Sequence, residues 1–153
     1  MKRTICFVMV SFAIISLSCK THNQEKNCSI NSVEKTISEL KKQVIECGDS
    51  CAYDDLKIQL MDFNYGSEEL LPYAMVMANK YDYAQAYYDV FDCLTIPYWS
   101  DFSRIDPKTA ELAVSYLLVA AEKGDEQASE IVESFSISNK TQDCVELICH
   151  IYQ

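Results

Sequence analysis

The chain has 153 residues, and its 23 Asp and Glu residues outnumber its 13 Lys and Arg residues, which gives a net charge of −10. This length predicts a single folded domain. The acidic balance argues against a nucleic-acid ligand and against direct adhesion to anionic lipid surfaces. Two interpretations of the charge stay open: a solvated acidic surface, or a docking face for a partner with a basic patch.

A signal peptide is predicted over residues 1–18. Lys2 and Arg3 precede an apolar run over 5–17, which is too short to span a bilayer as a mature helix. The run ends in a small residue before Cys19, and this pattern resembles the signal of bacterial lipoproteins. The resemblance implies lipidation of Cys19 and a lipid-anchored protein on the periplasmic or surface face of the bacterial cell envelope. An uncleaved anchor and ordinary secretion are the alternatives.

The mature chain is expected to consist of a tether and one domain. Residues 19–31 contain Cys19 and a polar segment without apolar periodicity, which is typical of a flexible linker. Residues 32–153 carry the periodic patterns and form the predicted helical domain.

Apolar spacing predicts a first pair of helices. Over 32–46, four residues spaced by four, three and four form one apolar stripe: Val33, Ile37, Leu40 and Val44. A second helix follows through Tyr53 and Leu60 and is broken around Asn64.

The next helix is predicted over 68–80, with Ser67 as its N-cap. It is apolar over much of its surface, so we expect it to be the central and most buried helix.

Three turns connect the predicted helices in a repeated pattern. Gly48-Asp49 aligns without a gap with Gly124-Asp125, and each Asp is placed to cap the helix that follows. Tyr81-Asp82 is a weaker copy with one extra residue before Ala86. Tyr81 stands where Gly would supply a left-handed conformation, so another geometry is expected there. The turn aspartates are 33 and 43 residues apart, which are periods of helical-hairpin repeats.

The third pair of helices is the most clearly marked. Asp106 is a good N-cap followed by Pro107, and the helix that it begins closes at Gly124. The second helix of this pair runs to Phe135, and a last helix is predicted over 142–152.

An aromatic loop over 95–105 separates the second pair of helices from the third. Its aromatic side chains are either a lid folded onto the core or an exposed contact patch.

The pattern Tyr116-Leu117-x-x-Ala120-Ala121-Glu122-x-Gly124-Asp125-x-x-Ala128 resembles Sel1-like repeats, relatives of tetratricopeptide repeats. The resemblance covers about residues 45–135, although Lys57, Phe91 and Glu133 stand where the family usually has Gly. It implies an all-α fold: a short right-handed stack of about three helical hairpins with a C-terminal capping helix. Members of the family are mostly interaction scaffolds.

Six cysteines follow Cys19 and are candidates for disulfides in an exported protein: Cys28, Cys47, Cys51, Cys93, Cys144 and Cys149. Cys47 and Cys51 flank a turn and are placed for a local bridge, whereas Cys144 and Cys149 point apart on a helix. The alternative is that several are small buried residues. The cysteine and histidine spacing does not predict a metal site.

Catalytic patterns are missing from the sequence. The two histidines, His22 and His150, lie in the tether and near the end of the chain, and neither belongs to a known catalytic motif. We therefore expect a protein that is not an enzyme and needs no cofactor.

The ten tyrosines and one tryptophan are the remaining feature of the sequence that bears on function. Four aromatic residues are predicted to contact a partner, although helical tyrosines also serve as core support: Tyr87, Tyr88, Tyr98 and Trp99. The expected function is a membrane-anchored scaffold or adaptor that binds a protein or peptide. Alternatives are an immunity or inhibitor protein against a toxin, a cell-wall small-molecule binder or hydrolase, and a plain spacer.

Overall fold

A computed structural model describes residues 35–62, 66–137 and 143–153 of the chain. Within these ranges the secondary structure is entirely helical, with no strand, which confirms the all-α fold. Cys19, Cys28 and the predicted boundaries at 18 and 31 lie outside the described residues. None of the described helices has the length and apolar character needed to cross a bilayer.

The described ranges contain seven α-helices and two short 3-10 turns. Their bounds are α1 (Ile37–Cys47), α2 (Ser50–Asp62), α3 (Gly66–Tyr81), α4 (Ala84–Thr95), η1 (Ile96–Tyr98), η2 (Phe102–Arg104), α5 (Pro107–Glu122), α6 (Glu126–Ser134) and α7 (Cys144–Ile151).

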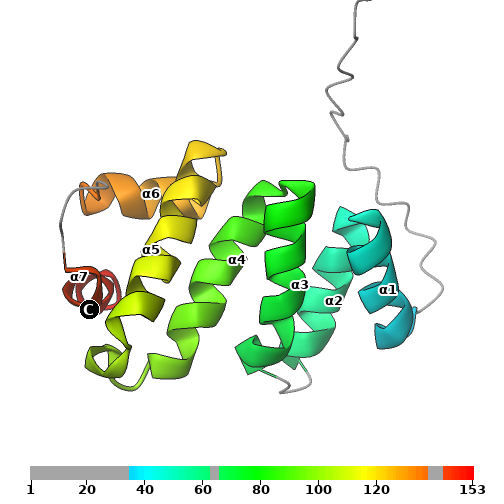
Figure 1. The fold of residues 1–153 in the computed structure, drawn as a ribbon, viewed down its shortest axis with the longest axis horizontal. Coiled ribbons are helices and arrows are strands. Elements are labelled where there is room, and N and C mark those ends of the chain that lie inside the picture. The colour runs from blue at the N-terminus through cyan, green and yellow to red at the C-terminus, as the bar shows by residue number, and fades with distance from the viewer. Residues whose placement is uncertain (1–34, 63–65, 138–142) are drawn as a thin grey trace, which may run out of the picture. The chain divides into compact units, whose positions relative to one another are not determined.

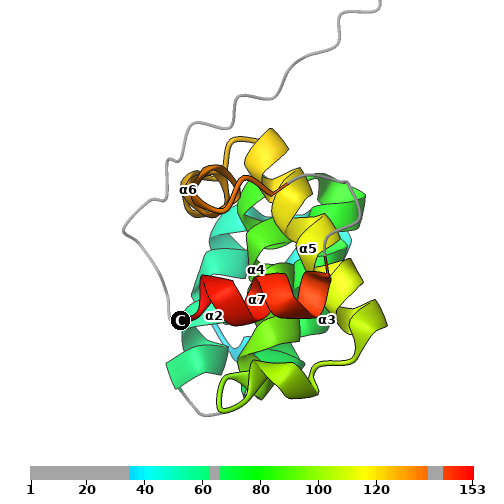
Figure 2. The ribbon, with the colours of Figure 1, turned by 90° about the vertical axis from the view of Figure 1, so that its left-hand side faces the viewer.

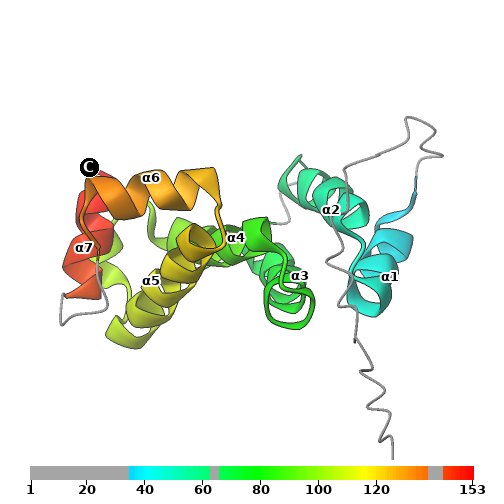
Figure 3. The same cartoon turned by 90° about the horizontal axis from the view of Figure 1, so that it is seen from above.

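From α1 to α6, helices that follow one another in the chain pack side by side (Figure 1). Helix α3 contacts α1, α2 and α4, and α5 contacts α4, α6 and α7. Seen from above, α2 and α6 lie on one side of the domain, α3 and α5 on the other, and α4 runs between them (Figure 3). With α7 in front (Figure 2), the last helix is seen lying against α5, with which it is in contact.

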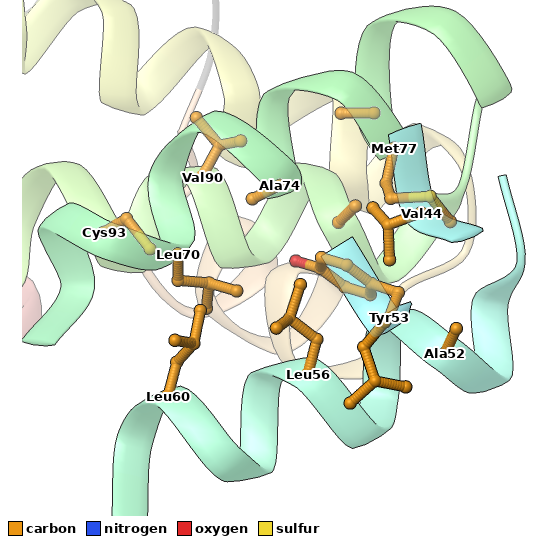
Figure 4. Close-up of a cluster of buried hydrophobic side chains, with 13 residues drawn as sticks. Val44, Ala52, Tyr53, Leu56, Leu60, Leu70, Ala74, Met77, Val90 and Cys93 are labelled. Atoms are coloured by element: carbon orange, nitrogen blue, oxygen red, sulfur yellow. The ribbon is translucent and has the colours of Figure 1, made fainter. Parts of the chain in front are cut away.

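The described core consists of two apolar clusters that meet at α4. The first joins α1, α2, α3 and α4, and Figure 4 shows Tyr53 among its aliphatic side chains. The second joins Phe91 of α4 to α5, α6 and α7. Tyr87 and Leu94 of α4 pack against both clusters. Helix α4 therefore connects the two halves of the core.

The expectation that the helix over 68–80 is the most buried one is wrong. Helix α3 has several exposed residues, whereas every residue of α4 from Ala84 to Thr95 is buried or half-buried. The apolar pattern did not reveal this because two of the buried residues of α4, Asp89 and Thr95, are polar. Hydrogen bonds rather than apolar character explain their burial.

Several helix starts match the sequence, and two differ from it. Asp106, Asp125 and Asp143 each cap a helix by accepting hydrogen bonds from backbone N–H groups. Helix α1 begins at Ile37 rather than at residue 32, because Thr36 and Glu39 form a capping box. Ser67 is not an N-cap, because it is a buried residue inside α3.

The three turns share a left-handed residue, but not at the positions that the sequence alignment paired. Gly48 and Gly124 have φ values of 64° and 84°, and in the second turn Asp82 takes this conformation, with φ of 57°. Asp82 thus corresponds to the glycines rather than to Asp49 and Asp125. Asp is one of the few residues that tolerate this region. When Asp82 is aligned with Gly48 and Gly124, the second turn no longer has an extra residue. Each left-handed residue then precedes a fully buried alanine by four positions: Ala52, Ala86 and Ala128.

Successive turns are also in contact with each other. The ring of Tyr81 lies against Gly48, where an added Cβ would be 2.3 Å from the nearest ring atom. The hydroxyl of Tyr81 donates to the carbonyl of Ile45 at 2.9 Å. At the next turn, Lys123 forms an ion pair of 2.5 Å with Asp82. These contacts join the first turn to the second and the second to the third.

Gly48 and Gly124 make a matched pair for testing the packing between turns. Both require a left-handed backbone, which costs a residue with a Cβ about 1–2 kcal/mol. Only Gly48 also contacts Tyr81, while the space at Gly124 is open. We expect Gly48→Ala to lower the free energy of unfolding by about 2–4 kcal/mol and Gly124→Ala by about 1 kcal/mol. Urea denaturation measures both; equal losses would contradict the contact.

Candidate functional site

The candidate site lies on the part of α4 that contacts Tyr53 and Lys57 of α2 and Tyr152 near the C-terminus. Asp89, near the middle of α4, is only 1% exposed. It accepts a hydrogen bond of 2.8 Å from the hydroxyl of Tyr53 and forms an ion pair with the ammonium group of Lys57. Both donors come from α2. Because a buried carboxylate needs such partners, this group fixes α2 against α4.

Burial has a clear electrostatic effect on Tyr53. Loss of solvent raises the pKa of its phenol far above the usual value, and the negative charge of Asp89 raises it further. Tyr53 therefore stays a neutral hydrogen-bond donor to Asp89. The Tyr53, Lys57 and Asp89 group thus connects α2 to α4.

Asp92 lies nearly one helical turn beyond Asp89 and is more accessible. Burial raises the pKa of its carboxyl to about 6, and the charge of Asp89 acts in the same direction. Lys57 offsets part of this effect, but no described residue forms an ion pair with Asp92. Its carboxyl accepts a long, weak hydrogen bond of 3.4 Å from the hydroxyl of Tyr152. Asp92 is thus a carboxylate that lacks a cation.

Tyr152 holds the end of the chain against α4. Its ring stacks on Phe102 at 4.5 Å and lies parallel to Phe91 at 6.3 Å. Its hydroxyl is 3.0 Å from the hydroxyl of Thr95. Burial raises the pKa of the Tyr152 phenol to about 12, so it remains protonated beside Asp92. Tyr152 therefore lies beside the half-buried carboxyl of Asp92.

The predicted partner-binding residues separate into different environments. Tyr87 lies away from Asp92, where it donates to Asp82 at 3.0 Å and packs 5.9 Å from Tyr116. Tyr88 is half-buried and packs 6.0 Å from Phe91. Tyr98 is half-buried against the second core cluster. Trp99 is 81% exposed.

The aromatic loop is both a lid and an exposed patch. Instead of an irregular loop over 95–105, the chain forms η1 and η2, and Phe102 covers the core beside Tyr152. Trp99 donates its backbone N–H to Ile96 at 3.1 Å, and Asp101 donates its own to Tyr98 at 2.8 Å. These bonds present Trp99 to solvent on an ordered turn.

Four residues follow one another at helical spacing, of which Tyr88 and Asp92 are half-buried and Ile96 and Trp99 are exposed. We call them the α4 stripe. Ile96 keeps helical backbone angles after the end of α4 and is 39% exposed. Residues four apart lie on the same side of a helix, so the stripe continues the surface of α4 into η1. Sequence reasoning missed Asp92 and Ile96, although their spacing from Tyr88 was the available signal.

The cysteines of the described ranges form no disulfide with one another. The local bridge between Cys47 and Cys51 is therefore not formed. Cys93 is 3% exposed in the first core cluster, and burial raises the pKa of its thiol to about 12. This fits the alternative expectation of a small buried residue. No group of described residues is arranged to hold a metal ion.

The chain was compared with protein-family models, with curated proteins and with solved structures, and none of these comparisons found a match.

Two lysines allow the buried ion pair to be tested against an exposed one. The side chains of Lys57 and Lys41 are both 29% exposed, but the partner of Lys57 is the buried Asp89, whereas Glu69, the partner of Lys41, is 48% exposed. We expect Lys57→Ala to lower the free energy of unfolding by about 2–4 kcal/mol, because it leaves a buried charge. Lys41→Ala should cost less than about 1 kcal/mol. Chemical denaturation of both variants is the measurement, and similar values would contradict the role of Asp89.

The raised pKa of Asp92 predicts that the stability of the fold depends on pH. Its pKa is raised in the folded chain, from 3.8 to about 6, so the folded state binds a proton before the unfolded state does. The free energy of unfolding therefore increases by about 1 kcal/mol as the pH falls from 7.5 to 5. Asp92→Asn should remove this gain and raise the stability at pH 7.5. Urea denaturation across this pH range is the measurement. If the stability of the variant and that of the wild type depend on pH in the same way, the pKa of Asp92 is not raised.

Proposed function

We propose that the chain is a membrane-anchored lipoprotein whose helical domain binds another protein or a peptide and performs no catalysis. The observation that carries the proposal is Asp92, a half-buried carboxylate that forms no ion pair with the described residues. It lies between the half-buried ring of Tyr88 and the exposed side chains of Ile96 and Trp99. Aromatic side chains are enriched at protein contact surfaces, and a carboxylate beside them gives a charged group of the partner a place to pair.

The arrangement of turns supports a repeat scaffold related to Sel1-like and tetratricopeptide repeats. Three pairs of helices are each joined by a turn with one left-handed residue, and a buried alanine follows four residues later. The left-handed residues are Gly48, Asp82 and Gly124, at intervals of 34 and 42 residues. Intervals of this size are typical of helical repeats, which build binding surfaces from stacked helices. On this proposal α7 is the capping helix.

The partner is proposed to present positive charge. The formal net charge of the chain is −10, and Asp92 is close enough to Asp89 and Asp125 for both charges to raise its pKa. A lysine or arginine of a partner would relieve this repulsion and gain a charge-assisted hydrogen bond. No cofactor is needed for such binding.

Anchoring is proposed through the lipid on Cys19, on the strength of the leader pattern in the sequence. Replacing Cys19 with Ser should release the protein from the membrane fraction and abolish incorporation of labelled palmitate. Unchanged membrane association of the variant would show that the anchor lies elsewhere.

The binding proposal is tested by quantitative affinity capture from cells that produce the chain, with wild type and Trp99→Ala compared. Trp99 suits this test because it is 81% exposed, so its removal should leave the fold intact. Leu112→Ala, at a side chain that is 43% exposed on α5, is the control. We expect at least one protein that wild type and the Leu112 variant retain and the Trp99 variant loses, by about tenfold. Equal capture by all three proteins would reject Trp99 as a contact.

A further inference from the structure

We propose that the α4 stripe receives a peptide segment of a partner protein in which one lysine or arginine is followed, about one helical turn further along, by a bulky apolar side chain. The positive charge would pair with Asp92, and the apolar side chain would cover Ile96 and Trp99. This inference rests on the proposed function and specifies the partner that the same site would take.

The geometry of α4 determines the spacing of the two contacts. Asp92 and Ile96 are four residues apart, and Ile96 retains helical backbone angles, with φ of −50° and ψ of −40°. Four residues of an α-helix rise about 6 Å, so the backbones of Asp92 and Ile96 are separated by about that distance along the helix axis. A partner whose charge and apolar group are separated by more than two turns would not reach both.

The sign of the charge follows from the groups around Asp92. Asp89 and Asp125 oppose its ionisation, and Lys57 is already bound to Asp89. The hydroxyl of Tyr152, at 3.4 Å, is a neutral partner. A partner carboxylate at this place would meet uncompensated negative charge, whereas one guanidinium or ammonium group would neutralise it.

The apolar end of the stripe is ordered before any partner binds. Trp99 lies on a turn closed by the hydrogen bond from its N–H to Ile96. The turn is held on the core by Tyr98 before it and Phe102 after it. Binding therefore requires little ordering of the chain at Trp99, which favours affinity. Aromatic side chains held in this way are frequent hot spots.

A random peptide library without tryptophan, displayed on phage and selected on the full-length chain in detergent, supplies the probes. Selected peptides are synthesised and titrated into the protein while the fluorescence of Trp99, the single tryptophan of the chain, is followed. We expect a consensus with Lys or Arg and a bulky apolar residue, and a blue shift of the Trp99 emission on binding.

Matched variants decide whether the stripe is the site. Asp92→Asn and Ile96→Ser should each weaken the selected peptides by about tenfold or more. Glu122→Gln and Leu112→Ser are the controls, since Glu122 is an exposed acid and Leu112, at 43% exposed, matches Ile96 at 39%. The controls should keep the wild-type affinity. Because Asp92→Asn is expected to stabilise the fold, weaker binding by this variant would not be due to unfolding.

Two other results would overturn the inference in different ways. Peptides that bind all four variants equally, or that lack a basic residue, would reject the stripe as the site but keep the proposed binding function. If selection yields no peptide that binds the wild-type chain, both the inference and peptide binding as the function fail.

Discussion

The buried carboxylate of Asp89 is the constraint on which the arrangement of the described domain depends. A charge that is 1% exposed is tolerated only with good donors, and α2 supplies both of them, the hydroxyl of Tyr53 and the ammonium group of Lys57. Helix α2 is thereby held against α4 in one orientation. The same pairing engages Lys57, whose charge also acts on Asp92, so among the described residues Asp92 forms no ion pair of its own. Structural stability and the proposed recognition site therefore arise from the same group.

Helix α4 connects the two halves of the described core, because both apolar clusters contain residues of this helix. The turns give a second, independent set of connections, in which the ring of Tyr81 lies on Gly48 and the charge of Asp82 is paired with Lys123. Neighbouring pairs of helices are thus joined through α4 and again at their turns. A surface that runs along α4 is supported on both sides, which is the condition for contacts that are ordered before binding.

The sequence predicted most of the local structure and less of its arrangement. Helix periodicity and capping residues located the helices, and Asp106 and Asp125 cap as the sequence predicted. The burial of α4 was missed because hydropathy counts Asp89 as a surface residue, and only the packed structure shows Tyr53 and Lys57 beside it. The role of Asp82 was misassigned for a related reason, since a left-handed backbone is marked by Gly in two turns but not in the third. Of the predicted contact residues, Trp99 is exposed, whereas Tyr98 is half-buried against the core.

Site-specific photocrosslinking in cells that produce the chain tests the central claim most directly, which is that the α4 stripe contacts a protein partner. A photoreactive residue is placed at Ile96 or Trp99, and at Leu112 as the control, because all three side chains are exposed. The account predicts a discrete crosslinked protein from positions 96 and 99 and none from position 112. If positions 96 and 99 give no crosslinked protein, or position 112 gives the same one, the α4 stripe is not the binding surface.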